Sequence, residues 1–507
     1  MLWTDFLCNL KFGGDQMRPK IEAVETLAKK YPSVPLCISF EIKNLNLCKL
    51  TQVCDQLGDA FQLTIAAHKK EKYSYFTLRP HASVTVLDGS IVVRKGTSET
   101  IIQQDPHTYI EELLLQQQQP KLAGMPPFTG GLVGYFSYEY TKYYLKKISF
   151  THSNPNSLKD AGFLLCDFII AYRHSDHRLF LIQSVDSKKL PASYVQAAKK
   201  LHSIKQELLA LLKQECKEPT LSQLSSFKLQ HSLQSFTAGI TKAKKHINDG
   251  DIFQLIYSNP HSCLSKGSLL PMTRQLSQSD PSPYNFYFHQ ANFQVAGASP
   301  ETLVTKTSEK LVTYPLAGTR RRGITPAEDE RFANELQNDP KELAEHNMLV
   351  DLGRNDLGQV SRFGSVHVTA HAQLERYSKV MHLASTIEST ADPAKSTLDI
   401  LESVFPAGTL SGAPKVRAIQ IIDKLEKTKR GVYGGCFGYL GFNNDMDVCI
   451  GIRLIHKTNN TTIIHTGAGI VADSIPKFEY QECLNKSRAV DQAFKKVAGG
   501  NSNGAFN

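Results

Sequence analysis

Short apolar runs separated by turn residues dominate the first part of the chain. Runs rich in Val, Ile, Leu and Phe that are bounded by Gly, Asp, Asn or Ser are typical of β-strands. Such runs are Ser83–Leu87, Ile91–Arg94, Phe163–Tyr172 and Leu179–Ser184. In Phe128–Tyr138 glycines stand beside aromatic residues, a composition typical of strands that approach each other closely. The pattern predicts a β-rich N-terminal part.

The pattern changes near residue 190. In Tyr194–Glu215, Leu, Ala and Ile recur at helical spacing among Lys and Gln, which predicts an amphipathic helix. A Ser-rich polar stretch follows, and beyond it Gly, Pro and charged clusters alternate with strand-like runs. We divide the chain into an N-terminal region (1–190), a connector (191–234), a region where chemistry is expected (235–497) and a tail (498–507). The periodicities together predict mixed α and β structure.

Two helix starts carry pairs of acids. Asp339 suits an N-cap and Pro340 the first helical position, so Glu342 and Glu345 fall three apart on one face of a helix. The segment 474–476 (Ser-Ile-Pro) opens a second helix in which Glu479 and Glu482 have the same spacing. Such pairs are also common on ordinary solvated helices, and the sequence does not show that the two helices meet.

Four carboxylates at one site would repel one another and raise their pKa values unless a cation neutralised them. A hard cation with oxygen ligands satisfies this need. Mg²⁺ usually takes one or two carboxylates directly and keeps several waters. If the two helix starts converge, we expect a magnesium site there.

Composition and charge exclude several classes of protein. The chain has 507 residues, 41% hydrophobic and 21% charged, with a formal charge of +10. Its ten cysteines have no metal-ligand spacing, no signal peptide is recognisable, and no apolar run reaches the ~18 residues of a membrane helix. We therefore expect a cytoplasmic protein with no membrane contact. The basic clusters at 69–72, 242–245 and 320–322 are short, which disfavours nucleic acid; an anionic small molecule suits the third better.

A set of motifs stands in a fixed order in the second half of the chain. The strings are GDIFQ (250–254), GASPE (297–301), PLAGTRRRG (315–323), ELAEHNMLVDLGRNDLG (342–358), YSKVMHLAS (377–385), GTLSGAPKVRA (408–418), RGVYGGCFGY (430–439), IGIR (450–453), GAGIVADS (467–474) and EYQECLNKSRA (479–489). Each string is weak alone, but their order over about half the chain is specific. Together they resemble the chorismate-utilising enzymes, which comprise the large subunits of anthranilate and aminodeoxychorismate synthases and the isochorismate and salicylate synthases. A looser match covers GGLVGYFSYE and KYSYF in the N-terminal part.

The resemblance implies a fold and a binding site. The expected fold is α+β, a large two-sheet α/β/β/α chorismate-binding core with an N-terminal β-rich subdomain intertwined with it. Both acidic helices would line the site, with Glu345 and Glu482 as direct Mg²⁺ ligands and Glu342 and Glu479 holding its waters. The implied substrate contacts are Arg453, which suits a carboxylate, Tyr433, and the backbone of Gly318, Thr319, Gly467, Ala468 and Gly469.

The resemblance also implies catalytic roles. Hydroxide is a poor leaving group, so loss of the C4 hydroxyl of chorismate needs a general acid, which the resemblance assigns to Glu301. Burial or neighbouring carboxylates would have to raise its pKa. The resemblance gives His382 a part in the later loss of a ring proton and pyruvate, although a lone histidine among apolar residues could equally belong to the core.

Two positions separate the reactions of the family. Members that add water carry a lysine where this chain has Gln254, and aminodeoxychorismate synthases typically carry a lysine where it has Ala317. Ammonia is already nucleophilic and needs neither lysine. The pattern implies an anthranilate synthase reaction, in which chorismate and ammonia give anthranilate and pyruvate, the first committed step of tryptophan biosynthesis. The alternatives are an aminodeoxychorismate synthase subunit and a non-catalytic chorismate-binding regulatory protein.

A partner and an inhibitor follow from the same resemblance. Cys436 is the sole superficial candidate for a glutaminase nucleophile, and it lies inside a chorismate-site motif, so we expect a separate glutaminase subunit. Tryptophan commonly inhibits these enzymes at a PSPY loop, here Pro281, Ser282, Pro283 and Tyr284, together with an N-terminal motif. That motif is poorly matched by Ile38–Ile42, where Ile42 replaces a serine. We expect weak or absent tryptophan inhibition.

Overall fold

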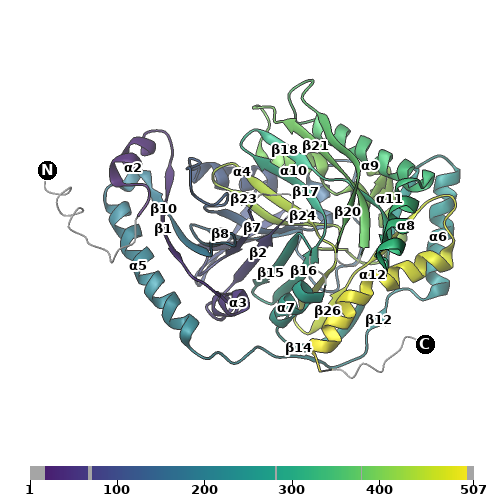
Figure 1. Cartoon of the computed structure of the whole chain (residues 1–507), viewed down its shortest axis with the longest axis horizontal. Helices are drawn as coiled ribbons and strands as arrows, with labels where there is room; N and C mark the ends of the chain where they lie inside the picture. The colour runs from purple at the N-terminus through teal and green to yellow at the C-terminus, as the bar shows by residue number, and fades with distance from the viewer. Residues whose placement is uncertain (1–16, 67–70, 280–281, 378–379, 500–507) are drawn as a thin grey trace.

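The protein is described by a computed structural model that covers residues 17–66, 71–279, 282–377 and 380–499. Two large antiparallel sheets lie face to face, and helices cover the outer side of each (Figure 1). This arrangement confirms the predicted α/β/β/α architecture. Among the described residues, no helix is both long and apolar enough to cross a membrane.

The first sheet has twelve strands. Its order is β1-β10-β9-β3-β2-β15-β16-β25-β26-β14-β11, and β12 pairs with β14. The strands are β1 (Ser33–Glu41), β2 (Ala60–Ile65), β3 (Tyr73–Phe76), β9 (Phe168–Arg173), β10 (Arg178–Asp186), β11 (Leu221–Gln223), β12 (Lys228–Leu229), β14 (His261–Gly267), β15 (Tyr284–Gln290), β16 (Phe293–Ser299), β25 (Leu454–Thr458) and β26 (Thr461–Ile464).

The second sheet also has twelve strands. Its order is β19-β21-β18-β17-β24-β23-β7-β8-β4-β5-β6, and β20 pairs with β21. The strands are β4 (Ala82–Leu87), β5 (Ser90–Lys95), β6 (Ser98–Gln103), β7 (Gly131–Phe136), β8 (Ala161–Cys166), β17 (Thr302–Thr307), β18 (Lys310–Thr313), β19 (Leu316–Arg321), β20 (His367–Arg376), β21 (Val380–Thr390), β23 (Cys436–Gly441) and β24 (Met446–Ile450).

A small sheet and the helices complete the fold. The small sheet has the order β22-β13-β27, with β13 (Gln254–Ser258), β22 (Gly412–Ala413) and β27 (Gly467–Ile470). The α-helices are α2 (Ile21–Ala28), α3 (Leu47–Gln56), α4 (Pro106–Gln116), α5 (Ala192–Lys213), α6 (Leu233–Asn248), α7 (Leu270–Ser279), α8 (Pro326–Gln337), α9 (Pro340–Gly358), α10 (Thr397–Val404), α11 (Lys415–Leu425) and α12 (Pro476–Val497). Short 3₁₀ helices are η1 (Tyr138–Tyr143), η2 (Ser187–Lys189) and η3 (Gly408–Leu410).

Aromatic side chains fill the space between the two large sheets. Phe286 of β15 stacks on Phe437 of β23 with ring centroids 4.5 Å apart, and Tyr75 of β3 meets Tyr439 of β23 edge to face at 5.8 Å. All four side chains are almost fully buried. Because aromatic pairs bury large areas, this layer fixes one sheet against the other.

Most local predictions are confirmed. The runs at 83–87, 91–94 and 179–184 are β4, β5 and β10, and the amphipathic pattern after residue 190 is α5. The glycine-rich stretch before residue 138 is β7, in which a Cβ on Gly134 (φ +153°) would lie 2.0 Å from the carbonyl oxygen of Gly162. Only glycine fits there because the neighbouring strand β8 is so close.

One strand prediction is wrong. The apolar run Phe163–Tyr172 is two strands, β8 in the second sheet and β9 in the first, and the chain crosses between the sheets at Asp167. Both strands are buried on both faces, so the apolar pattern continues across the break. The carbonyl of Asp167 accepts hydrogen bonds from the backbone of Ser184 and the side chain of Gln183 at this crossing.

Candidate functional site

Both predicted acidic helix starts are present. The Asp339 carboxylate caps α9 by accepting from the backbone N–H of Lys341 and Glu342. Helix α12 has Pro476 in its first turn, while the Ser474 hydroxyl accepts from the backbone N–H of Val471 just before the helix. These starts place Glu342 and Glu345 in the first turns of α9, and Glu479 and Glu482 in the first turns of α12.

The electrostatics show that the two helix starts face each other. Burial raises the pKa of Glu345, and so do the carboxylates of Glu342 on its own helix and Glu482 on α12. Burial likewise raises the pKa of Glu479, with a further increase from Glu482, while Lys341 of α9 lowers it. Since these charges act across the gap between α9 and α12, the structure brings together the two pairs that the sequence places 137 residues apart.

Cations already accompany two of these acids. The Lys486 ammonium lies 2.6 Å from Glu482 and also donates to the carbonyl of Gly467. Arg320 of β19 lies 2.9 Å from both Asp339 and Glu342. The two other arginines of the 320–322 cluster pair with Glu328 and Asp329 at the start of α8.

The donor set fits a hard divalent cation. Glu345 and Glu482 repel each other, and both side chains are only partly buried. A cation between them would relieve the repulsion. Within the described ranges, no three acidic, histidine or cysteine side chains are close enough to bind one metal ion as they stand. A cation that uses one or two carboxylates and keeps its waters, as Mg²⁺ does, suits this arrangement.

Glu301 is a buried acid beside these helices. It follows β16, and burial raises the pKa of its carboxyl to about 7. Three neighbours lower this pKa in part. The Thr409 hydroxyl donates to Glu301 Oε1 at 3.1 Å, and Arg453 and Lys486 contribute positive charge. The carboxyl is therefore partly protonated near neutral pH and can donate a proton.

Arg453 has an unusual backbone. Its φ of +49° places a non-glycine residue in the left-handed region. Such a conformation costs of order 1 kcal/mol or more and is often found at functional sites. Because its charge lowers the pKa of Glu301, the guanidinium acts on the same site.

His382 lies on β21 opposite Thr319 of β19. Its Nδ1 is 3.0 Å from both the Thr319 hydroxyl and the carbonyl oxygen of Gly318. Since a carbonyl only accepts, the proton on Nδ1 satisfies Gly318. A Cβ on Gly318 (φ +67°) would lie 3.1 Å from a carboxylate oxygen of Glu342, so this pair of strands adjoins the acids of α9.

The small sheet adjoins the acids of α12, because Lys486 contacts both Glu482 and the carbonyl of Gly467. In it, β13 pairs with β27 so that Ile256 faces Gly469 and Ser258 faces Gly467. A Cβ on Gly467 would lie 2.8 Å from the Tyr433 hydroxyl, and one on Gly469 would lie 3.2 Å from the Gln254 side-chain nitrogen. A side chain at position 467 would displace the Tyr433 hydroxyl, whereas one at position 469 would require only a small shift of Gln254. Ala468 between them is fully buried.

Gln254 carries an unsatisfied buried acceptor. Only 5% of the residue is exposed, and its side-chain oxygen has no hydrogen-bond partner among the residues that the structure describes. Leaving such an oxygen unpaired costs about 1–3 kcal/mol. A group that donates N–H or O–H into the site would remove that cost.

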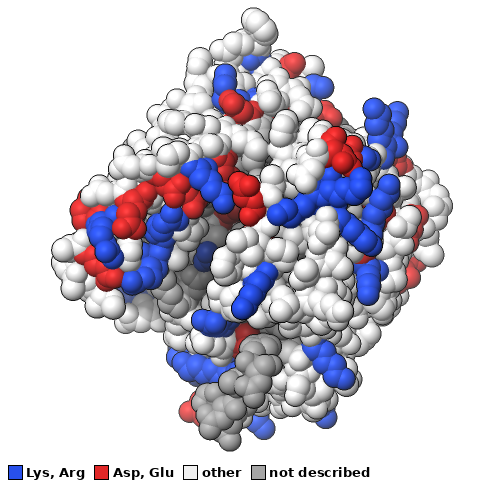
Figure 2. Space-filling view, turned by 90° about the vertical axis from the view of Figure 1, so that its right-hand side faces the viewer, with Lys and Arg blue, Asp and Glu red and all other residues white. Residues whose placement is uncertain are grey.

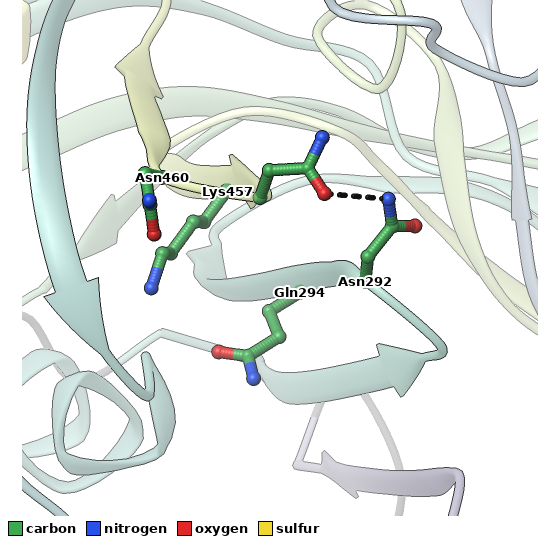
Figure 3. Close-up of a pocket in the computed structure, with 5 residues that line it drawn as sticks. Asn292, Gln294, Lys457 and Asn460 are labelled. Atoms are coloured by element: carbon green, nitrogen blue, oxygen red, sulfur yellow. Dashed lines mark hydrogen bonds between the residues drawn. The ribbon is translucent and has the colours of Figure 1, made fainter.

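Two hollows differ in chemistry. A narrow cavity behind Glu301 offers about 50 Å³ to water-sized molecules and is lined by Thr409 of η3, Asp356 of α9 and apolar side chains of α9 and α10. A separate polar depression of about 330 Å³ lies between the β15–β16 and β25–β26 turns (Figure 3). Its lining is three asparagines, Gln294 and Lys457, and it contains no carboxylate.

The face that carries α6, α8, α9, α11 and α12 mixes charges of both signs. Figure 2 shows acidic and basic side chains interleaved in a band on the left of this view, and mostly basic side chains among uncharged residues on the right and below. The ion pairs of Arg320–Arg322 contribute to this mixture.

The remaining predicted positions are placed as follows. Ala317 is buried on β19, opposite Leu383. Burial raises the pKa of the Cys436 thiol to about 12, so Cys436 is not a reactive nucleophile. Of the expected inhibitor loop, Pro281 lies outside the described residues, whereas Ser282 and Pro283 precede β15 and are partly buried. Strand β1, which holds Ile38, is separated from β15 by β10, β9, β3 and β2.

The sequence analysis missed three residues of the site. Lys486 could have been found, since it stands four residues after Glu482 on one helix face. Arg320 belongs to a recognised motif, but its pairing with α9 depends on the tertiary fold. The Thr409–Glu301 hydrogen bond joins residues 108 apart, and no local pattern predicts it.

Comparisons with known proteins agree on one family. A family model described as chorismate binding enzyme matches residues 65–492. The chain is 34% identical to anthranilate synthase component 1 of Acetivibrio thermocellus, over 94% of this chain and 99% of that protein. It is 37% identical to aminodeoxychorismate synthase component 1 of Bacillus subtilis, over 84% of this chain and 89% of that one. The structure of anthranilate synthase component I from Streptococcus pneumoniae matches with a TM-score of 0.73 at 30% identity, covering 82% of this chain and 92% of the other.

Proposed function

The chain belongs to the family of chorismate-binding enzymes, and from this premise we propose that it is the chorismate-binding subunit of an anthranilate synthase. It would convert chorismate and ammonia into anthranilate and pyruvate. Anthranilate synthase component 1 proteins among its relatives match nearly the whole chain, which supports this choice. Because the relative from Bacillus subtilis is named as an aminodeoxychorismate synthase component, that activity is the second candidate.

The observation that carries the proposal is the chemistry at two positions. Gln254, whose side-chain nitrogen lies near Gly469, offers an unpaired buried oxygen, and an N–H of ammonia is a donor of suitable size for it. An amide cannot take a proton from water, so Gln254 does not favour hydration of the ring. Ala317 has no nucleophilic atom, so no covalent lysine intermediate forms there.

In the first half of the reaction, the neutral carboxyl of Glu301 donates its proton to the C4 hydroxyl of chorismate, which leaves as water. The nitrogen of ammonia forms its bond at C2 while the two ring double bonds shift and the C4–O bond breaks. The nitrogen then loses a proton, which restores the neutral Glu301 carboxyl, so the charges balance. Thr409 holds the Glu301 carboxyl in place by its hydrogen bond. Because burial raises the pKa of Glu301 to about 7, the acid form is available near neutral pH.

In the second half, a ring proton and the pyruvate group leave, which makes the ring aromatic. His382 assists this elimination, held in orientation by the carbonyl of Gly318. Arg453 and the Tyr433 hydroxyl bind the carboxylate of the enolpyruvyl group, and the backbone of Gly467–Gly469 borders it. A planar guanidinium matches a carboxylate through two hydrogen bonds.

Glu345 and Glu482 would hold Mg²⁺, with Glu342 and Glu479 positioned to hold its waters. Bound there, the ion would supply a positive charge for the ring carboxylate of the substrate. Lys486 and Arg320 would have to yield part of their contacts with these acids. We further propose that ammonia comes from a separate glutaminase subunit, and that tryptophan inhibits weakly or not at all.

The test is incubation of the purified chain with chorismate, Mg²⁺ and ammonium salt, followed by mass spectrometry and anthranilate fluorescence. Anthranilate and pyruvate in equal amounts are expected, whereas glutamine in place of ammonium should give no product. Accumulation of 4-amino-4-deoxychorismate would identify the second candidate. Isochorismate as the product would overturn the interpretation of Gln254.

A further inference from the structure

Two neighbours hold the ring of Tyr433. The residue is 4% exposed, and its hydroxyl lies beside Gly467 of the small sheet. The imidazole of His465 stacks on the ring, with centroids 4.3 Å apart and planes 13° from parallel. The guanidinium of Arg430 lies 5.7 Å from the centre of the same ring. The place of the hydroxyl therefore depends on what holds His465 and Arg430.

A continuous chain of hydrogen bonds holds both neighbours. His465 Nε2 is 2.8 Å from the Ser258 hydroxyl, which is 2.7 Å from Glu426 Oε1. The same carboxylate accepts two hydrogen bonds from Arg430, at 2.8 and 2.7 Å. Arg430 also donates to the carbonyls of Leu410 and Ile256, so it ties η3 to β13. All four side chains are buried.

The protons in these hydrogen bonds have one consistent arrangement. Burial alone would raise the pKa of Glu426, but Arg430 lowers it to about 2, so the carboxylate only accepts. Ser258 must therefore donate to Glu426, and its oxygen accepts from His465 Nε2–H. Burial lowers the pKa of His465 to about 3, which keeps the imidazole neutral at pH 7. The result is one fixed tautomer of a neutral ring.

We propose that Arg430, Glu426, Ser258 and His465 act as a clamp that positions the Tyr433 hydroxyl to donate to a carboxylate of the substrate. His465 and Ser258 are then positioning residues, which act on substrate binding through Tyr433. Since burial raises the pKa of Tyr433 well above its usual value, its hydroxyl stays a neutral donor. The identity of that carboxylate as the enolpyruvyl group of chorismate rests on the proposed function.

The first measurement is the Kd of chorismate with Mg²⁺ and without ammonia, by calorimetry, so that no nucleophile enters the result. His465→Leu removes the stacked ring and should weaken binding about tenfold, as should Tyr433→Phe, which removes the hydroxyl. His465→Phe keeps a flat ring but not the bond to Ser258, and Ser258→Ala frees the imidazole; each should weaken binding about threefold. With ammonium present, KM should rise by the same factors while kcat changes less than twofold.

A double-mutant cycle separates positioning from general damage. In the Tyr433→Phe background, His465→Leu should weaken chorismate binding by less than twofold, because the hydroxyl that it positions is already gone. A tenfold further loss in that background would overturn the clamp, as would a fall in kcat with KM unchanged. If His465→Leu does not fold, Ser258→Ala and His465→Phe are tested in the same cycle.

His456→Leu is the matched control. Burial lowers the pKa of His456 to about 4, as it does for His465. Its charge would also act on His465, but its ring lies 6.0 Å from Phe293, and among the described residues no hydrogen bond or ring contact joins it to His465 or Tyr433. This variant should bind chorismate as the unmodified chain does. If the unmodified chain binds chorismate but makes no anthranilate, the proposed function fails and the Kd cycle still judges the clamp. If it does not bind chorismate, the clamp is overturned as well.

Discussion

The layer between the two large sheets and the region around the acidic helix starts are opposite kinds of interior. The first contains aromatic rings such as Phe286 and Phe437, packed in contact with one another. The second contains buried or half-buried acids whose pKa values are raised, and a non-glycine residue with positive φ. The first region lowers the free energy of the folded state, and the second raises it. This contrast is what we expect if the acids serve the proposed chemistry and not stability.

The largest effect on activity is expected at the acids of α9 and α12. Glu345→Gln combined with Glu482→Gln should lower turnover of chorismate by more than about 10⁴-fold, because the proposed Mg²⁺ would lose both of its carboxylate ligands. Thermal stability should stay equal or rise, since two repelling charges are removed. Steady-state assays over a range of Mg²⁺ concentrations measure the effect.

The matched control is Asp351→Asn, on the exposed side of α9, where Asp351 pairs with Arg354. It should leave turnover unchanged. Turnover that survives the double substitution with its metal dependence intact would contradict the assignment of both acids.

The inter-sheet layer should respond in the opposite way. Phe437→Ala removes a fully buried ring that stacks on Phe286 and should lower the free energy of unfolding by about 4 kcal/mol. The KM of the molecules that remain folded should not change. Urea unfolding measures the loss, and Phe363→Ala, which removes a fully exposed ring, should change stability by less than about 0.5 kcal/mol.

A substitution of Glu301 should change both activity and stability. Glu301→Gln should lower kcat about 100-fold or more, since the general acid is lost. Its folded pKa of about 7 lies above the ordinary value of 4.5, so stability is lost as the pH rises from about 4.5 to 7, and the full loss is present above pH 7. The variant avoids this loss and should be about 3 kcal/mol more stable at pH 8, with little gain at pH 4, where both states are protonated.

Glu139 provides the contrast for that substitution. Burial also raises its pKa to about 7, but both its oxygens accept backbone N–H groups, from Arg430 and Gly431. An amide in its place would point an NH₂ at one of these donors, so Glu139→Gln should lose stability where Glu301→Gln gains it. A gain in both variants would show that burial alone decides the effect.

The smallest expected effect is in the pH profile. The acid form of Glu301 is present below its pKa of about 7 and is lost as the pH rises through that value. Expressed per free ammonia, kcat/KM should fall about tenfold per pH unit above 7. The residual activity of Glu301→Gln should lack this fall, and an identical slope in the variant would assign the titration to another group.

Local patterns predicted β4, β5, β10 and α5 because turn residues and helical spacing are encoded nearby in the chain. They also predicted α9 and α12, whose starts are marked by Pro340 and Pro476. The crossing at Asp167 was missed, since an apolar run reports burial but not the sheet that provides it. The small sheet and the Thr409–Glu301 bond were missed because both join distant segments. The family motifs, and not periodicity, indicated the residues of the site.

The central pairing of β7 with β23 has a consequence for the making of the protein. β7 ends at Phe136, and its partner strand begins at Cys436, 300 residues later. At about 5–20 residues per second, the ribosome needs roughly 15–60 s to supply that partner. During this time one edge of β7 has no strand beside it, and such edges invite aggregation. We expect the newborn chain to depend on chaperones until its last third has emerged.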